Sequence, residues 1–119
     1  MAHGAGKPGG AERLGRFDQF LAEQFGYFLE RLHSTPEGDG TLLDHTVVLY
    51  GSSNSRTHQN RNYPLVLAGG SKLGLKHGHY RRYGNDVPLS NLFVTMLDRI
   101  GVPLEGSSDS TAEMSELLT

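Results

Sequence analysis

The sequence predicts an α/β fold with an incomplete sheet and flanking helices. Two segments carry apolar residues at helical spacing, and two short runs of β-type residues lie between them. No further strand-like run follows in the 119 residues, so the predicted sheet is short. We expect one α/β unit at positions 11–103, preceded by a flexible lead at 1–10 and followed by an acidic, Ser-rich surface tail at 104–119.

The first helix is predicted over positions 11–33. Its apolar residues recur every three or four positions and form one stripe, which consists of Leu14, Phe17, Leu21, Phe25, Phe28 and Leu32. Neighbouring apolar residues widen this face, so the helix is expected to dock against a sheet or a second helix. Pro36 and the glycines after it end the helix in a turn.

Two short strands are predicted at positions 46–50 and 64–68. The first reads Thr-Val-Val-Leu-Tyr, and the second continues from Pro64 as Leu-Val-Leu-Ala. Neither run alternates cleanly between apolar and polar residues. This pattern indicates burial on both faces, as in the middle of an α/β sheet.

The second helix is predicted over positions 88–100. Its apolar residues follow helical spacing from Leu89 to Ile100, Pro88 suits the first turn, and Gly101 with Pro103 supplies the stop. Two strands and two helices do not complete an α/β layer, because a two-stranded sheet is marginal alone. We therefore expect a missing N-terminal part of the same protein to supply further strands, with Met1 an internal start or a gene-model boundary.

Charge is strongly polarised along the chain. Positions 45–85 contain no Asp or Glu, yet they hold six of the eleven Lys and Arg and four of the six His. All thirteen acidic residues lie elsewhere, against five bases. Clustered cations attract anions, so this acid-free window predicts an anionic ligand such as a phosphate, a sulfate or an acidic glycan.

Five basic side chains are the candidate anion-binding residues: Arg56, Arg61, Lys76, Arg81 and Arg82. The guanidinium of Arg pairs two oxygens of a phosphate or sulfate, and the tyrosines beside Arg81 and Arg82 add stacking surface. The alternative is a basic face that pairs with acidic residues of the helices, such as Glu23, Glu30 or Asp98. Nucleic acid is not expected, since the sequence pI is near 6.3 and the basic stretch is short.

Three histidines of the window are candidate metal ligands: His58, His77 and His79. His58 lies in a polar loop at positions 51–62 between the strands, where α/β proteins commonly bind ligands. Hydrolytic metal sites also use carboxylates, and only Asp44 and Asp86 flank the window. Solvated surface histidines are the competing interpretation, and no motif marks a nucleophile among the loop serines.

The order of these motifs is similar to the carboxyl-terminal part of the bacterial family called domain of unknown function 1552. The resemblance covers positions 11–111 and is carried by Thr35 to Asp44, Val47 to Ser52, Thr57-His58, Asn62 to Gly70, Leu75 to Arg81 and Pro88 to Leu92. Family members are several times longer, often begin with an export signal, and have no established activity. The resemblance implies that this chain is a fragment or a truncated homologue.

A more distant resemblance is to the metal-binding half of alkaline-phosphatase-like hydrolases. It implies that His58 matches a metal-binding His, with a divalent metal ion as cofactor in the full-length parent. Those enzymes have an Asp-His pair at the end of the first strand, where this chain has Gly51 to Asn54. This departure leaves a complete two-metal site in doubt.

Two classes of function therefore stay open. In one, the chain belongs to a hydrolase-like protein whose basic loops bind a phosphate or sulfate group, and the isolated 119 residues are inactive. In the other, it is a non-catalytic binding or scaffolding module for acidic ligands such as glycans. The absence of Cys excludes a thiolate nucleophile, and no run predicts a membrane span or an export signal, so the compartment stays undetermined.

Overall fold

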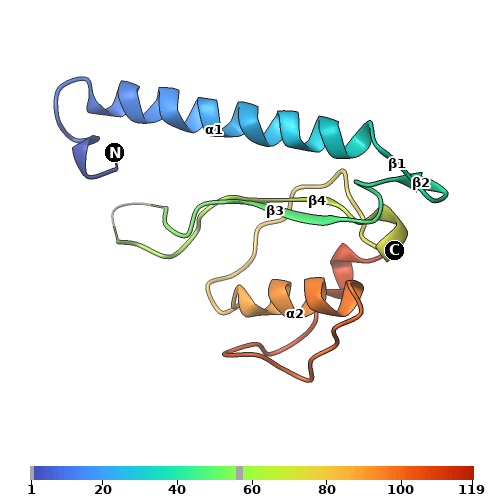
Figure 1. The fold of residues 1–119 in the computed structure, drawn as a ribbon. Coiled ribbons are helices and arrows are strands. Elements are labelled where there is room, and N and C mark those ends of the chain that lie inside the picture. Colours follow the sequence, from blue (N-terminus) through green and yellow to red (C-terminus); the bar gives the residue numbers. More distant parts are fainter. Residues whose placement is uncertain (1, 56–57) are drawn as a thin grey trace.

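The computed structural model describes residues 2–55 and 58–119 of the chain (Figure 1). In chain order, its helices and strands are α1 (Gly10–His33), β1 (Pro36–Glu37), β2 (Gly40–Thr41), β3 (Val47–Gly51), β4 (Leu65–Gly69) and α2 (Ser90–Arg99). Short 3-10 turns occur at Ala2–Gly4, Ser71–Leu73 and Ser115–Leu117. This mixed composition confirms the predicted α/β class in its general form.

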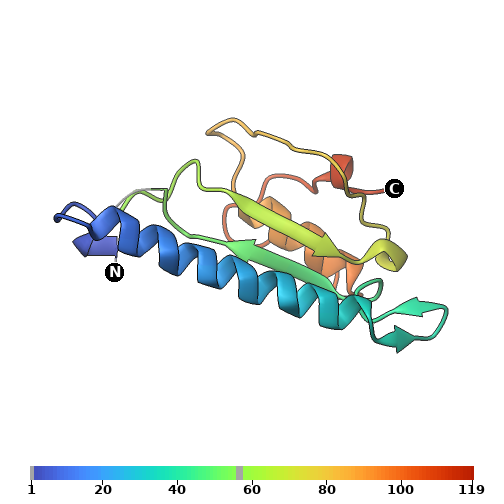
Figure 2. The same cartoon turned by 90° about the horizontal axis from the view of Figure 1, so that it is seen from above.

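The elements form three layers with the β3–β4 hairpin in the middle. Figure 1 shows α1 on one face of the hairpin and α2 on the other, and Figure 2 shows that α1 runs along the length of β3. The strands pair antiparallel in an uninterrupted register from Val47 opposite Gly69 to Gly51 opposite Leu65. A β-strand turns alternate side chains to opposite faces, so Tyr50 faces α1 and Leu49 faces α2. The apolar runs without clean alternation are thus explained by helices on both faces.

The best-packed core lies between the hairpin and α2. Leu92 of α2 is buried together with Met114 and Leu117 from the end of the chain. Around them pack Leu49, Leu65, Leu67, Leu89 and Met96. The surface tail predicted at 104–119 is therefore wrong for its last third, because two of its apolar residues complete the core. The prediction from composition missed them because they stand among serines and acids.

Buried and part-buried hydrogen bonds attach the C-terminal segment, residues 111–119, to α2. The Asn91 carboxamide oxygen accepts from the Thr111 amide at 2.7 Å, and the Thr95 hydroxyl accepts from the Met114 amide at 2.8 Å. Leu75 also forms an isolated antiparallel bridge with Leu118. The C-terminal segment thereby joins α2 to the turn that follows β4.

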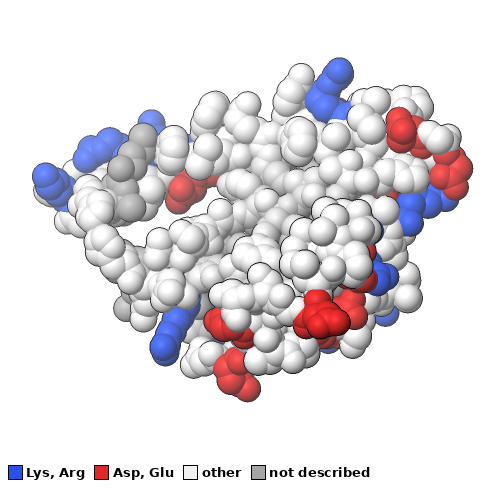
Figure 3. Space-filling view, turned by 60° about the horizontal axis from the view of Figure 1, so that its bottom comes forward, with Lys and Arg blue, Asp and Glu red and all other residues white. Residues whose placement is uncertain are grey.

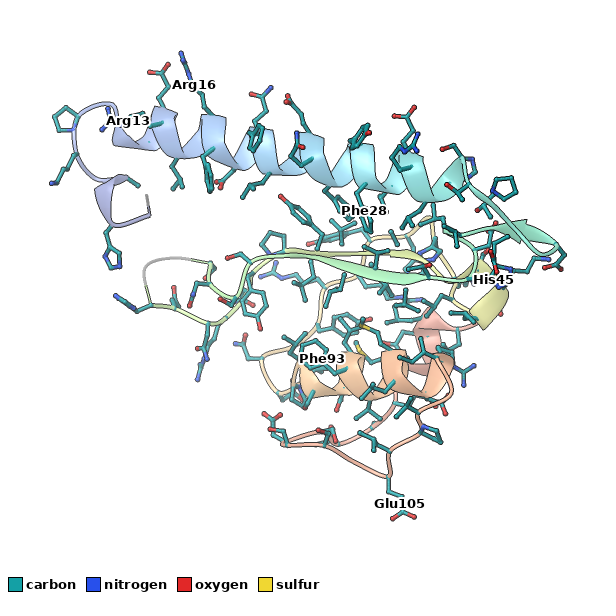
Figure 4. The ribbon with its side chains drawn as sticks, viewed as in Figure 1. Arg13, Arg16, Phe28, His45, Phe93 and Glu105 are labelled. Carbon is teal, nitrogen blue, oxygen red and sulfur yellow. The ribbon has the colours of Figure 1, made fainter. Side chains whose placement is uncertain are left out.

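The opposite face is covered less completely. Phe25 of α1 stacks on Tyr50 of β3 with ring centroids 4.4 Å apart, yet Gly10 is the one buried residue of α1. Phe28 lies on the side of α1 that faces the hairpin (Figure 4), and it is still 47% exposed. The predicted docking of this helix on the sheet is therefore real but partial.

The element boundaries differ from the predicted ones by one or two residues. The helix expected at 11–33 begins at Gly10, the strands expected at 46–50 and 64–68 each start one residue later, and the helix expected at 88–100 spans Ser90–Arg99. The lead expected to be flexible at 1–10 contains the Ala2–Gly4 turn. The turn expected before Gly40 contains the two-residue strands β1 and β2, which propensity cannot detect at that length.

The chain is less compact than a complete domain of its size. Its radius of gyration is 16.5 Å, where 119 residues normally give about 13.5 Å. Its accessible surface is 8500 Å², where a folded monomer of 13.0 kDa exposes about 6,300 Å². In the described residues, neither helix combines the length and apolar character needed to cross a membrane.

Candidate anion-binding surface

The basic segment from Lys76 to Tyr83 connects the turn after β4 to the start of α2. It is fixed at its beginning, where the Lys76 amide donates to the Leu117 carbonyl at 2.8 Å and the His77 Nε2 donates to the Gly69 carbonyl at 2.5 Å. Within the described residues, no backbone hydrogen bond involves positions 78–82. The segment is thus anchored at one end while its amides and side chains stay accessible.

The three cations of this segment are exposed and form no ion pair within the part of the chain that the structure describes. Lys76, Arg81 and Arg82 are all exposed, and Tyr80 beside them is 89% exposed. Of the acidic residues expected to pair with them, Asp98 pairs with Arg99 instead. Glu23 and Glu30 form no ion pair with a described residue. Internal neutralisation, the alternative interpretation of the basic window, does not apply to these three side chains in the described structure.

The two tyrosines of the segment differ in exposure. Tyr80 is 89% exposed, whereas Tyr83 is 36% exposed. Burial raises the pKa of Tyr83 to about 12, and a hydrogen bond to Glu116 adds to this shift. Tyr83 is thus the more enclosed of the two rings, and Tyr80 is the freely accessible ring beside Arg81 and Arg82.

Arg61 lies at the other end of the hairpin. It belongs to the loop that joins β3 to β4, whereas Lys76 follows the far end of β4, and five strand residues span about 15 Å. Arg61 is exposed and unpaired among the described residues, but it does not share one site with Lys76. Arg56, the fifth predicted anion-binding residue, lies outside the described residues.

The remaining basic residue of the window serves the fold. Lys72 Nζ lies 2.7 Å from Asp39 Oδ2, and His45 Nε2 lies 3.6 Å from the other oxygen of that carboxylate. The Lys72–Asp39 salt bridge joins the β1–β2 turn to the turn after β4. Figure 4 shows His45 at this end of the molecule. The salt bridge depresses the pKa of Asp39 and raises that of Lys72.

Asp44 reinforces the same junction, although its only functional signal in the sequence is its place at the edge of the acid-free window. Its carboxylate accepts from the Ser71 hydroxyl at 2.5 Å and from both the amide and the hydroxyl of Thr41, at 2.8 and 2.7 Å. These hydrogen bonds lower the pKa of Asp44 from 3.8 to about 2. They keep the carboxylate ionised and tie two turns together, which is a structural role.

The candidate metal ligands are not gathered at one point. His58 lies in the β3–β4 loop, where its ring centroid is 5.2 Å from that of His3, a neighbour the sequence did not suggest. His77 and His79 follow the opposite end of β4, and His77 already uses Nε2 on a carbonyl. Across the described residues, no three His, Cys, Asp or Glu side chains form a group suited to a metal ion. These residues do not by themselves make up a two-metal site.

Among the described residues, neither of the two best-defined hollows is lined by Arg61, Lys76, Arg81 or Arg82. One hollow of about 570 Å³ lies between the N-terminal lead and α1, where it is lined by Gly4, Gly10, Arg13, Leu14, Arg16 and Phe17. Another of about 220 Å³ lies between α2 and the C-terminal segment and includes Asp98, Glu105 and Glu113. Figure 3 shows the Lys and Arg side chains of one face as separate groups. The cations thus form an open surface, and a ligand there would remain partly solvated.

Comparison of the chain with protein-family models, curated proteins and solved structures finds no match.

Proposed function

We propose that this chain binds acidic ligands, such as sulfated or phosphorylated glycans, through the segment from Lys76 to Tyr83. The observation that carries the proposal is the exposure of Lys76, Arg81 and Arg82 without an ion pair to any described residue. An exposed, unpaired guanidinium retains its five donors for a phosphate or sulfate group. The exposed ring of Tyr80 supplies a stacking surface for a sugar beside that charge.

An extended acidic ligand suits this surface better than a single small anion. The cations are spread along an open segment, and Arg61 extends the basic surface toward the far end of the hairpin. A polymer with repeated anionic groups contacts several separated cations at once, which compensates for the weakness of each solvated contact. A single phosphate would meet only one or two of them and would stay in water.

Immobilised heparin tests the proposal directly. We expect the chain to be retained at low salt and released as salt rises, since screening weakens contacts between exposed charges. Arg82→Ala should weaken binding roughly fivefold, about 1 kcal/mol for one charge-assisted contact. Arg16→Ala is the matched control, because it removes the same charge from a side chain already paired to Glu12. Absence of retention, or equal losses in both variants, would reject the proposal.

A second candidate is that the chain forms the carboxyl-terminal part of a hydrolase-like protein similar to domain of unknown function 1552. The supporting observation is a two-stranded sheet enclosed by helices on both faces, with more exposed surface than a complete domain has. In that case the basic segment binds the phosphate or sulfate of an ester, and His58 contributes to a divalent metal site completed by the missing N-terminal part. The distant alkaline-phosphatase-like resemblance is part of the same proposal.

The hydrolase candidate requires the longer protein for its test. With divalent metal present, we expect it to cleave model phosphate or sulfate esters and to lose turnover in His58→Ala. If this chain binds heparin while the longer protein neither binds metal nor cleaves the esters, the binding-module proposal is favoured. Turnover that is insensitive to His58→Ala would exclude the proposed metal role.

A further inference from the structure

The N-terminal lead, residues 2–9, folds back along the start of α1 and lies beside the loop that joins β3 to β4. Figures 1 and 2 both show the lead and this loop at the same end of the molecule. There His3 and His58 meet, with ring centroids 5.2 Å apart and ring planes tilted by 53°. Two segments that are far apart in the sequence thus bring two imidazole rings together.

The fold-back of the lead depends on Gly10, which is buried. A Cβ added at Gly10 would overlap the Gly4 carbonyl oxygen and lie 2.9 Å from that of Ala5. The Lys7 amide donates to the Gly4 carbonyl at 3.1 Å, and the Gly10 amide donates to the Lys7 carbonyl at 2.8 Å. The lead therefore packs directly on the helix backbone, an approach that requires glycine. This contact sets the position of His3.

The second ring is presented by the β3–β4 loop. His58 has a left-handed backbone with a φ of 58°, a conformation that His adopts more readily than most residues with a side chain. Beside it, the Ser55 amide donates to the Gln59 carbonyl at 2.9 Å. This hydrogen bond fixes the backbone next to His58.

Both rings are accessible and uncommitted. His3 and His58 are exposed, and within the described residues neither ring forms a hydrogen bond or an ion pair. Other histidines differ in this respect, since His77 contacts the Gly69 carbonyl and His45 lies beside Asp39. The nitrogens of the His3–His58 pair can therefore turn toward a common ligand without breaking an existing contact.

The spacing of the pair fits one metal ion bound by both rings. Imidazole nitrogen is a preferred ligand of Zn²⁺, Ni²⁺ and Cu²⁺. With metal–nitrogen distances of about 2.1 Å and tetrahedral angles, two imidazoles on one ion have ring centres roughly 5 Å apart. The observed separation is 5.2 Å, and the 53° tilt lets the nitrogens converge where a parallel stack would not.

We propose that His3 and His58 together bind one divalent transition-metal ion, such as Zn²⁺, Ni²⁺ or Cu²⁺. Two protein ligands leave the other positions of the ion to water, so the ion exchanges and is bound less tightly than at a structural site with four protein ligands. The bound ion connects the N-terminal lead to the β3–β4 loop. Unlike the metal site of the hydrolase candidate, this site uses only residues of this chain. Binding of acidic ligands at Lys76 to Tyr83 does not require it, so the two proposals fail independently.

Titration calorimetry of the full chain with Ni²⁺, after removal of any histidine tag, tests the site. We expect a single ion to bind per chain. His3→Asn or His58→Asn should weaken binding about a hundredfold, because a second ligand on the same chain acts at a high effective concentration. Asparagine suits this test since it tolerates the left-handed backbone at His58. His79→Asn is the matched control, because it removes an exposed imidazole that lies away from the pair, and it should leave the affinity unchanged.

A second pair of variants tests the geometry while every imidazole is retained. Gly10→Ala should displace the lead and weaken Ni²⁺ binding as much as His3→Asn does. Gly15→Ala, also in α1, should leave binding unchanged, since a Cβ there has no neighbour within 4 Å. An absence of Ni²⁺ binding, an equal loss in His79→Asn, or full binding by Gly10→Ala would each overturn the proposal.

Discussion

Thr95→Val tests whether the C-terminal segment is integral to the core. Thr95 is fully buried, at 0% exposure, and its hydroxyl has two partners. It donates to the Asn91 carbonyl at 2.8 Å and accepts from the Met114 amide at 2.8 Å. Valine preserves the shape of the side chain but removes the acceptor for that amide. The substitution therefore isolates one buried hydrogen bond.

The expected cost follows from the partner left behind. The Asn91 carbonyl is inside a helix and still accepts its backbone hydrogen bond, so losing the Thr95 hydroxyl as a second donor costs little free energy there. The Met114 amide is left buried without an acceptor, which costs about 1–3 kcal/mol. With a urea dependence of about 1–3 kcal/mol per molar, the unfolding midpoint should fall by roughly 1 M with an unchanged slope.

Urea unfolding followed by circular dichroism measures this shift, and Thr95→Ser is the control. Serine retains the hydroxyl and loses a methyl group, so it should cost about 1 kcal/mol, the value of one buried carbon. Amide hydrogen exchange at Met114 should accelerate in the valine variant alone. If valine is as stable as the native chain while serine is weaker, the hydroxyl does not hold the segment.

Two further predictions concern pH and use the shifted groups. Because the pKa of Asp44 in the folded chain is about 2, below its ordinary 3.8, its carboxylate stabilises the fold above pH 4, and this stabilisation is lost as pH falls toward 2. Asp44→Asn should flatten that part of the stability profile measured by urea unfolding, and an unchanged profile would contradict the hydrogen bonds from Ser71 and Thr41. The pKa of Tyr83 is raised to about 12, so its contribution is complete below pH 10 and is lost as pH rises through 12. Ultraviolet titration should show one late-ionising tyrosine that disappears in Tyr83→Phe.

Periodicity predicted the elements but not their surroundings. The apolar stripe of α1 and the spacing from Leu89 to Ile100 located both helices, and the β-branched runs located both strands within one residue. Burial of those strands on both faces was inferred from their lack of alternation, and the structure shows helices on both faces. What sequence patterns could not indicate was the return of Met114 and Leu117 to the core, because two apolar residues among polar ones have no period.

The sequence predicted which basic residues form the candidate site but not how the fold arranges them. The acid-free window identified cations that are exposed in the structure, including Arg61, Arg81 and Arg82. It could not show that Lys72 is bound to Asp39, because the acid lies 33 positions earlier and meets it only through the fold. It also could not show that the hairpin separates Arg61 from Lys76, since both flank the same strand in sequence.

Nuclear magnetic resonance titration of the labelled chain with a sulfated heparin oligosaccharide tests whether the segment from Lys76 to Tyr83 binds acidic ligands. We expect salt-sensitive amide shifts concentrated from Lys76 to Tyr83, with smaller shifts near Arg61 and none along α2. Shifts confined to the N-terminal lead, or no shifts at low salt, would contradict it.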